Sequence, residues 1–383
     1  MAQVMSWTAI RSGLQLTGLS RVPATTPGIR PLRIAVVATS LEILGGQGVQ
    51  ARALSDGLRR DGYEVVFIPI NPVFPRALRW LRRVPLLRTA FNQMLYLPSL
   101  LKLRHADVVH VFSASYWSFL LAPAPAIQVA HWFGKRTVLH YHSGEAQWHL
   151  SRWGVLVHPW LRLSQRIVVP SEYLRRIFAR FGYQTEVIRN VVDTARFAYR
   201  ERAPLRPRLL SIRNLEPHYR VDILIRAFAL LKVRYPEATL VVAGYGSEAS
   251  RLRVLASSLK VQGICFTGRI EPEAVPALYQ QTDIFVNAAT IDNQPVSILE
   301  AFAAGLPVIT TGTGDIAAMV LHGEAGVIVP QLDPGAIAAA VVNLLEHPAQ
   351  AACMTRRAKA EAERYTWAQT RAQWATMYRS DQS

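Results

Sequence analysis

The sequence predicts an α/β protein made of two similar domains, each with a parallel sheet covered by helices on both faces. Apolar runs rich in Val and Ile alternate with segments of helical period along the whole chain, and that alternation is typical of parallel sheets buried on both faces. The chain has 383 residues, which exceeds what one hydrophobic core usually supports. Two domains follow.

Six predicted strands fall in each half of the chain. In the first half the runs are RIAVVAT, EVVFIPI, DVVHVF, RTVLHYH, RIVVP and TEVIRN, at 33–39, 64–70, 107–112, 136–142, 166–170 and 185–190. In the second half they are PRLLSIRN, LVVAGYG, ICFTGR, DIFVNAA, PVITTG and GVIVP, at 207–214, 240–246, 264–269, 283–289, 307–312 and 326–330. The equal division indicates two domains of the same type.

Three segments lie outside these domains. The stretch ERAPLRPR at 201–208 carries two prolines and three arginines, which is typical of a link. Residues 1–31 contain arginines but no acid and no compact apolar core, so we expect a loose extension rather than a signal peptide. From Tyr365, aromatic residues recur near helical spacing and predict a terminal helix with an aromatic face to bury.

Composition narrows the setting of the protein. No apolar run reaches the roughly eighteen residues that span a bilayer. Only Cys265 and Cys353 occur, far apart, which favours a reducing compartment such as the cytoplasm. The formal net charge is +17. We therefore expect a negatively charged partner.

The charge is concentrated in residues 76–104. Seven Lys and Arg residues, no acid, and interleaved Trp and Leu residues occur there. Such a stretch is typical of a surface that lies on anionic lipid. The alternative is a solvated helix whose apolar face packs on the core. Nucleic acid is not favoured, because no zinc-finger spacing, RNP-type strand or base-reading basic helix is present.

Glycines follow the first predicted strand. Gly45, Gly46 and Gly48 precede a helix expected to start near Val49, so backbone amides there could approach a phosphate or a sugar. The spacing differs from the dinucleotide pattern G-x-G-x-x-G. Without further support, a tight strand-to-helix turn is the preferred explanation of the glycines.

The stretch DNQPVSILEAFAAG contains the most informative pattern. Pro295 suits the first position of a helix and Gly305 suits its end, so a helix is expected over 295–304. Its free N–H groups near Val296, Ser297 and Ile298 would form an anion site for a diphosphate. Glu300 is placed to accept the hydroxyls of a ribose, and Asp292 those of a second sugar. Alternatively, both acids only interact with the helix dipole, at about 0.3 to 1 kcal/mol each.

A diphosphate leaving group requires positive charge. Arg213 follows a strand at its ligand-facing end and Arg220 lies seven residues on, so we expect both to clamp the diphosphate. His142 is expected to hydrogen-bond the transferred sugar, with Glu145 in the same loop, whereas His110 and His140 are expected to be structural. We predict no metal site, because no third ligand and no D-x-D pair accompany the histidines.

Taken in order, these motifs resemble one family. The chain is similar to the retaining nucleotide-sugar glycosyltransferases of family 4, which have the GT-B fold. The resemblance covers nearly everything from Leu32 to Tyr378. Its motifs are GGQGVQ, LHYHSGEA, VPSEYLRRIF, IRNVVDTARF, RNLEPHYR, FTGR, and D-x(7)-E from Asp292 to Glu300. The chain departs from the family pattern in having Asp292 for Glu, Asn293-Gln294-Pro295 for Gly-Phe-Gly, and no lysine in the phosphate loop.

The resemblance implies two Rossmann-like domains facing across a cleft, with the C-terminal helix returning to the N-terminal domain. The domains would be 32–203 on the acceptor side and 204–364 for the donor, followed by the helix in 365–383. It implies catalytic roles for His142, Arg213, Arg220 and Asp292. The implied substrate-binding residues are Gly45, Gly46, Gln47, Glu145, Gly268, Arg269, Asn293, Gln294, Pro295, Val296, Ser297, Ile298 and Glu300.

The expected function is metal-independent, retaining transfer of a sugar from a nucleotide-diphosphate sugar to an acceptor hydroxyl. We expect a lipid-linked or membrane-proximal acceptor in polysaccharide or glycolipid synthesis, no cofactor, and a cytoplasmic protein at the inner face of the membrane. Two alternatives stay open. One is a nucleotide-sugar 2-epimerase on the same scaffold, and the other is a non-catalytic polyanion-binding protein.

Overall fold

The computed structural model describes residues 30–41, 45–75, 77–78, 80, 84–113 and 115–379. Of the expected features, the extension up to residue 29 and Arg76, Arg79, Arg82 and Arg83 of the basic stretch lie outside these residues. No helix in the described ranges is both long and apolar enough to span a bilayer.

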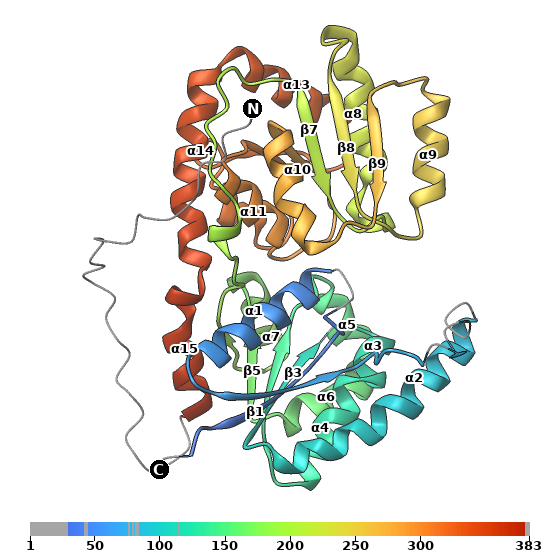
Figure 1. Cartoon of the computed structure of the whole chain (residues 1–383), viewed down its shortest axis with the longest axis vertical. Coiled ribbons are helices and arrows are strands. Elements are labelled where there is room, and N and C mark those ends of the chain that lie inside the picture. The colour runs from blue at the N-terminus through green and yellow to red at the C-terminus, as the bar shows by residue number, and fades with distance from the viewer. Residues whose placement is uncertain are drawn as a thin grey trace, which may run out of the picture. The chain divides into compact units, whose positions relative to one another are not determined.

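Two six-stranded parallel sheets form the framework (Figure 1). The first has the order β2-β1-β3-β4-β5-β6 and the second β12-β11-β10-β7-β8-β9. We call the parts that carry them the first half and the second half. The strands are β1 Arg33–Ala38, β2 Glu64–Pro69, β3 Val108–Ser113, β4 Arg136–Tyr141, β5 Arg166–Val169, β6 Glu186–Val187, β7 Arg208–Ile212, β8 Thr239–Ala243, β9 Ile264–Gly268, β10 Ile284–Asn287, β11 Val308–Thr311 and β12 Val327–Val329. The predicted fold class and all twelve predicted strands are confirmed, although β6 is much shorter than 185–190.

Helices connect the strands in both halves. The α-helices of the first half are α1 Gly46–Arg60, α2 Pro85–Ser99, α3 Trp117–Leu121, α4 Pro123–Trp132, α5 Ala146–Arg152, α6 Gly154–Leu163 and α7 Glu172–Arg180. Those of the second half are α8 Val221–Arg234, α9 Ala249–Ser258, α10 Val275–Gln281, α11 Val296–Ala304, α12 Ile316–Val320, α13 Pro334–Glu346 and α14 Pro348–Ala362, followed by α15 Trp367–Arg379. The 3₁₀ turns are η2 Leu100–His105, η3 Thr194–Arg196, η4 Pro217–Tyr219, η5 Pro272–Ala274 and η6 Glu363–Tyr365.

Each sheet is buried on both faces, as its apolar strands require. In β1, Ala35 and Val37 belong to a core formed with helices from α2 to α7, whereas Ile34 and Val36 belong to a core formed with α1 and α15. The second sheet packs α8, α9 and α13 on one face and α10, α11 and α12 on the other. Successive side chains of each strand therefore point alternately into two separate cores.

The C-terminal helix completes the first half. In Figure 1, α15 lies beside α1 at the first sheet, and Trp374, Met377 and Tyr378 are buried in the core of that face. The Tyr378 hydroxyl is hydrogen-bonded to His110 Nδ1 at 2.7 Å, and Arg371 pairs with Asp61 at 3.1 Å. The expected return of the helix to the N-terminal domain is confirmed.

The segment expected to link the halves is anchored rather than free. Arg202 is buried, and its guanidinium donates to the carbonyls of Ala304 at 2.6 Å and Tyr279 at 2.7 Å. Burial lowers its pKa to about 10. The arginine-rich composition of this segment thus includes one arginine that fastens it to the second half.

Candidate functional site

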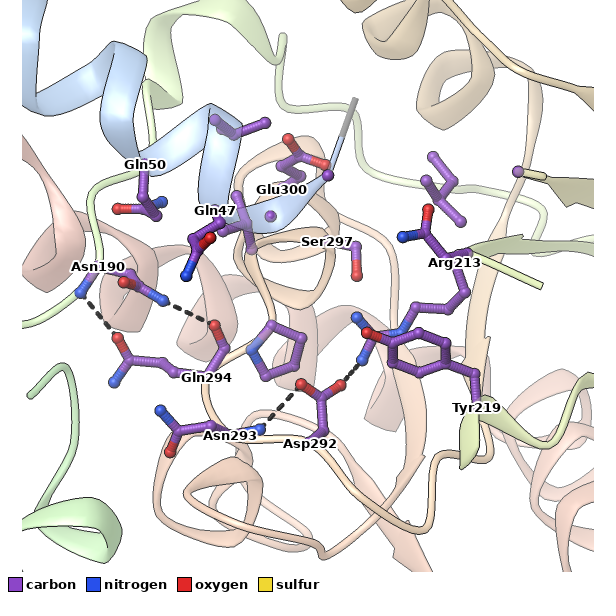
Figure 2. A pocket seen from close by; sticks show the side chains of 18 of the residues that line it. Gln47, Gln50, Asn190, Arg213, Tyr219, Asp292, Asn293, Gln294, Ser297 and Glu300 are labelled. Atoms are coloured by element: carbon purple, nitrogen blue, oxygen red, sulfur yellow. Dashed lines mark hydrogen bonds and ion pairs between the residues drawn. The ribbon is translucent and has the colours of Figure 1, made fainter. Parts of the chain in front are cut away.

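A cavity of about 410 Å³ lies at the carboxyl ends of strands from both sheets. In each sheet the chain reverses its direction of progress at one point, between β1 and β3 in the first and between β7 and β10 in the second. Ligands of open α/β sheets bind at such switch points. Residues after β1, β4, β7, β8 and β10 line the cavity, together with the start of α11 (Figure 2).

The start of α11 faces this cavity. Val296 and Ser297 are the first residues of the helix, so their N–H groups have no acceptor in a preceding turn. The Ser297 hydroxyl is buried and has no hydrogen-bond partner within the described residues. These groups form a site suited to an anion at a positive helix end.

Two details of the predicted helix are corrected. Pro295 lies before the helix with extended backbone, and α11 begins at Val296. The N–H of Ile298 donates to the Pro295 carbonyl at 3.2 Å, and the Ile298 side chain lies in the core instead of the cavity. Gly305 ends the helix with a φ of 76°, as expected for the residue type that adopts left-handed backbone most easily.

Arg213 and Asp292 form an ion pair at the second switch point, and Figure 2 shows their side chains pointing toward each other. Arg213 Nε also donates to Asn287 Oδ1 at 3.1 Å, and its guanidinium lies 4.8 Å from the centre of the Tyr219 ring. Burial lowers the pKa of Arg213. Sequence reasoning assigned the two residues to separate parts of the ligand and did not predict that they bind each other.

Glu300 lines the cavity from the second turn of α11. The Tyr279 hydroxyl donates to Glu300 Oε2 at 2.8 Å. Burial raises the pKa of Glu300 to about 7, although the Tyr279 hydrogen bond and the charge of Arg196 act in the opposite direction. A carboxyl group is therefore held within reach of a ligand at a cost in desolvation.

The first half contributes a row of histidines. His142 stacks on Phe112 with ring centres 5.1 Å apart, and its Nε2 is buried without a partner in the described part of the chain. Burial lowers its pKa to about 3, so the ring is neutral near pH 7. His110 Nε2 is hydrogen-bonded to His140 Nδ1 at 3.2 Å, which agrees with the structural role expected for His110.

The glycine loop also reaches the cavity. Gly45, Gly46 and Gln47 line it, as does Glu145 from the loop after β4. Helix α1 begins at Gly46, three residues before the predicted start at Val49. A Cβ atom at Gly45 or Gly46 would meet nothing within 4 Å, so the space beside the loop is open to a ligand.

Besides Ile298, three predicted site residues do not line the cavity. Arg220 donates to both Asp222 carboxylate oxygens, at 3.0 and 2.8 Å, and this local pair holds it at the start of α8. Arg269 is exposed and pairs with Glu271 at 3.5 Å. The Gly268 carbonyl accepts the N–H of Gly244 at 2.9 Å. The FTGR turn instead reaches the cavity through the next residue, Ile270.

Other predicted residues line the cavity while serving as links between the halves. The Asn293 side chain accepts the Ser171 hydroxyl at 2.6 Å. The Gln294 side chain accepts the N–H of Asn190 at 2.8 Å and donates to the Pro170 carbonyl at 3.0 Å. These bonds join the loop after β10 to the first half.

Sequence reasoning missed several residues of the cavity. Gln50, Asn190, His218 and Tyr219 all line it. Gln50 exchanges two hydrogen bonds with the backbone of Val191, at 2.7 and 2.8 Å. Its only signal in the sequence is a polar side chain on the face of a helix that otherwise carries Ala51, Leu54 and Leu58 into the core.

No group of three His, Cys, Asp or Glu side chains in the described ranges is placed to hold a metal ion. The positive charge of the site comes from Arg213, from Arg196 and from the start of α11.

Two family models match the chain in succession. Residues 44–196 match the model described as Glycosyltransferase Family 4, and residues 196–361 match Glycosyl transferases group 1. Together they include all of the cavity-lining loops. The chain belongs to the GT-B glycosyltransferases of family 4. The recognition made from the motifs is thus confirmed.

The relatives of this family 4 chain include characterised transferases. It is 31% identical over 275 residues to a glycogen synthase of Mycobacterium tuberculosis, covering 68% of this chain and 64% of the relative. It is 34% identical over 227 residues to a GDP-mannose-dependent phosphatidylinositol monomannoside mannosyltransferase of Mycolicibacterium smegmatis, covering 54% and 58%. The chain therefore spans less than two thirds of the length of these relatives.

Solved structures share the fold of this family 4 chain. Anabaena HepE in complex with UDP and glucose superposes with a TM-score of 0.70 at 18% identity, covering 90% of this chain and 99% of that protein. Sucrose-phosphate synthase from Thermosynechococcus elongatus gives 0.71 at 18% identity, covering 91% and 98%. At this identity the likeness shows the fold alone.

Proposed function

We propose that this protein is a retaining glycosyltransferase that transfers a sugar from a nucleoside-diphosphate sugar to an acceptor hydroxyl. The observation that carries the proposal is the convergence of the α11 start, Arg213 and Glu300 on one cavity. An N–H-rich helix end and a guanidinium suit a diphosphate, and a carboxylate suits a vicinal diol. The family and the nucleotide-bound neighbours support the same donor class.

Each part of the donor has a proposed partner. The diphosphate lies at Val296 and Ser297, where Arg213 reaches it and exchanges part of its pairing with Asp292 for phosphate oxygens. Glu300 accepts the ribose hydroxyls. Asp292 and His142 hold the hydroxyls of the transferred sugar. Glu145 and the loop from Gly45 to Gln47 line the acceptor side of the cavity.

In the proposed reaction, the acceptor oxygen forms a bond to the anomeric carbon as the bond from that carbon to the diphosphate oxygen breaks. The departing diphosphate takes the acceptor proton on the same face of the sugar, so configuration is retained and no protein nucleophile is needed. Negative charge grows on the leaving oxygens, where Arg213 and the helix end stabilise it most strongly. We propose that these groups replace a metal ion, so chelators should not reduce the rate.

We further propose a lipid-linked acceptor at the inner face of the membrane. Leu86, Met94 and Leu97 of α2 and Leu101 of η2 are exposed, whereas the core takes Tyr96, Leu100 and Leu103. Packing on the core therefore explains only part of the apolar content of residues 76–104. Two relatives have lipids in their names, the mannosyltransferase above and an alpha-monoglucosyldiacylglycerol synthase of Streptococcus pneumoniae, 25% identical over 276 residues.

Ligand-dependent thermal stability tests the donor proposal. A sugar nucleotide at about 100 times its dissociation constant should add about 2.7 kcal/mol to the free energy of unfolding. We expect one of the UDP, GDP or ADP sugars to do this. The Glu300→Gln variant should need about tenfold or more of the same sugar nucleotide to reach the same stabilisation. The exposed Glu273 offers a matched control, Glu273→Gln, which should bind as the wild type does.

The alternative functions give different results in the same assays. A 2-epimerase would convert one nucleotide sugar without any acceptor, which an NMR time course detects. A polyanion binder would show salt-dependent binding that survives Glu300→Gln. Absence of stabilisation by every sugar nucleotide would contradict the donor proposal.

A further inference from the structure

A second group of exposed apolar side chains lies outside residues 76–104, around Trp153 at the junction of α5 and α6. Trp117, Trp148, Val155 and Leu156 expose 65%, 54%, 90% and 52% of their surfaces. We call Trp117, Trp148, Arg152, Trp153, Val155 and Leu156 the Trp153 surface.

Ring contacts link some of these residues in pairs, and the others are their neighbours in the chain. The Trp153 ring lies 5.2 Å from that of Trp117 and 5.6 Å from that of Tyr116, centre to centre. The Arg152 guanidinium lies 4.5 Å from the centre of the Trp148 ring. Val155 and Leu156 follow on the first turn of α6.

Core packing does not account for these side chains. The inner faces of α5 and α6 already bury Leu150, Val157 and Leu161 in the core of the first half. Val155 and Leu156 point out of that core. Exposure to water gives an aliphatic side chain no favourable interaction. Adjacent exposed apolar residues with aromatic neighbours mark an interaction surface.

The segment of the chain that forms this surface has few acids and several cations. Between residues 84 and 171 the sequence contains only two acids, Asp107 and Glu145. Asp107 accepts the N–H of Arg33 at 2.7 Å, and Glu145 lines the cavity. The same interval contains eight cations, namely Arg88, Lys102, Arg104, Lys135, Arg136, Arg152, Arg162 and Arg166. A protein partner would usually meet a rim of both signs, whereas an anionic bilayer suits cations alone.

We propose that the Trp153 surface docks on the headgroup region of an anionic phospholipid bilayer. Val155 and Leu156 enter the boundary with the acyl chains, the tryptophans lie at headgroup level, and Arg152 binds lipid phosphates. This inference rests on the proposed function, because it supplies the route for a lipid-linked acceptor. The loop from His142 to Glu145 lines the cavity and leads directly into α5, so the docked surface lies next in the chain to the cavity wall.

Vesicle co-sedimentation tests the proposal. The probes are vesicles of equal parts phosphatidylglycerol and phosphatidylcholine, and vesicles of phosphatidylcholine alone. The full-length protein should bind the anionic vesicles more tightly. Val155→Asp should bind them about tenfold or more less tightly, since it removes an inserted side chain and adds a like charge.

A matched variant controls for the loss of any exposed valine. Val233 on α8 is 85% exposed and lies in the second half, so Val233→Asp should bind vesicles as the wild type does. Val155→Asp should also keep the thermal midpoint, because its side chain is exposed. Equal vesicle binding by both variants would overturn the proposal, as would failure of the wild type to bind either vesicle.

Two further measurements separate this inference from the proposals above. Leu86→Asp tests the 76–104 stretch, and loss of binding in that variant alone would assign docking to α2 and refute a role for the Trp153 surface. Stabilisation by sugar nucleotides should be the same in Val155→Asp and the wild type. Failure of donor binding with intact, Val155-dependent vesicle binding would refute the proposed function and leave the docking surface standing.

Discussion

Glu300 is a buried carboxyl group in the cavity wall. Its carboxyl group lies on a helix whose other side chains, from Ile298 to Phe302, are apolar and buried. Burial favours the protonated form and raises the pKa from 4.5 to about 7, while the Tyr279 hydrogen bond favours the carboxylate. The unliganded protein therefore holds a carboxyl group that changes charge near neutral pH.

This shift predicts a pH-dependent contribution to stability. Because the folded-state pKa lies above the unfolded one, the contribution of Glu300 is fully present below about pH 4.5 and is lost as pH rises through about 7. Relative to Glu300→Gln, the wild type should lose up to about 3 kcal/mol of unfolding free energy over that range. Urea unfolding at several pH values measures it. A difference that stays constant with pH would show that the carboxyl group is not buried as described.

Cavity residues that belong to a sequence motif could be predicted. Cavity residues that are positioned by contacts with distant parts of the chain could not. Asp292, Ser297 and Glu300 were found because a strand, a loop and a helix start occur within a few positions of one another. Gln50 and Asn190 were missed because their partners lie far along the chain, at Val191 and Gln294. Arg220 was misplaced because Asp222, two residues on, competes for its guanidinium.

Helix α15 packs on a different half of the protein from the helices that precede it in the sequence. It follows the second half but buries Trp374, Met377 and Tyr378 against the first sheet. Its carbonyl at Tyr378 accepts from Arg136 at 2.6 Å, and the Tyr378 hydroxyl meets His110. The helix thus connects with the row of histidines that ends at His142.

Removal of the Tyr378 hydroxyl should destabilise the protein. In Tyr378→Phe, the buried Nδ1 of His110 loses its partner, so the free energy of unfolding should fall by about 1 to 3 kcal/mol. Tyr199→Phe provides the comparison, because the Tyr199 hydroxyl has a longer 3.3 Å contact with Thr355 at a partly exposed position. Chemical denaturation of both variants tests this, and equal losses would contradict a special role for the Tyr378 bond.

Element positions were largely predictable. Val- and Ile-rich runs mark every strand because both faces of a parallel sheet are buried, and glycine or proline marks the ends of α11. The start of α1 was misjudged because Gly46 and Gln47 adopt helix despite the poor propensity of glycine. Aromatic spacing predicted α15, while its docking place was supplied by family resemblance.

The two halves are joined near the cavity by buried amides. Gln294, in the loop after β10, bonds to Asn190 and Pro170 of the first half. Within the halves, Gln294 also bonds to Asp315 at 3.2 Å, and Gln50 bonds to Val191. These side chains are almost fully buried, so water cannot replace a lost partner. The structure of the cavity and the association of the halves depend on the same groups.

Truncation of one such amide should destabilise the whole protein. Gln294→Ala leaves the Asn190 N–H and the Pro170 carbonyl without partners, and at about 1 to 3 kcal/mol for each orphaned group the free energy of unfolding should fall by about 2 to 5 kcal/mol. Gln262 is exposed, so Gln262→Ala should change it by less than about 0.5 kcal/mol. Calorimetry of the three proteins measures both changes. A wild-type midpoint in Gln294→Ala would show that these bonds do not hold the halves together.

The position of α15 also determines when the protein can finish folding during synthesis. The ribosome releases β1–β6 early, yet one face of that sheet lacks Trp374, Met377 and Tyr378 until α15 has emerged. Helix α1 covers part of this face, so nascent chains carry a partly uncovered apolar sheet face throughout translation of the second half, and such surfaces are prone to aggregate. We therefore expect that face to depend on a chaperone or on other contacts until α15 emerges.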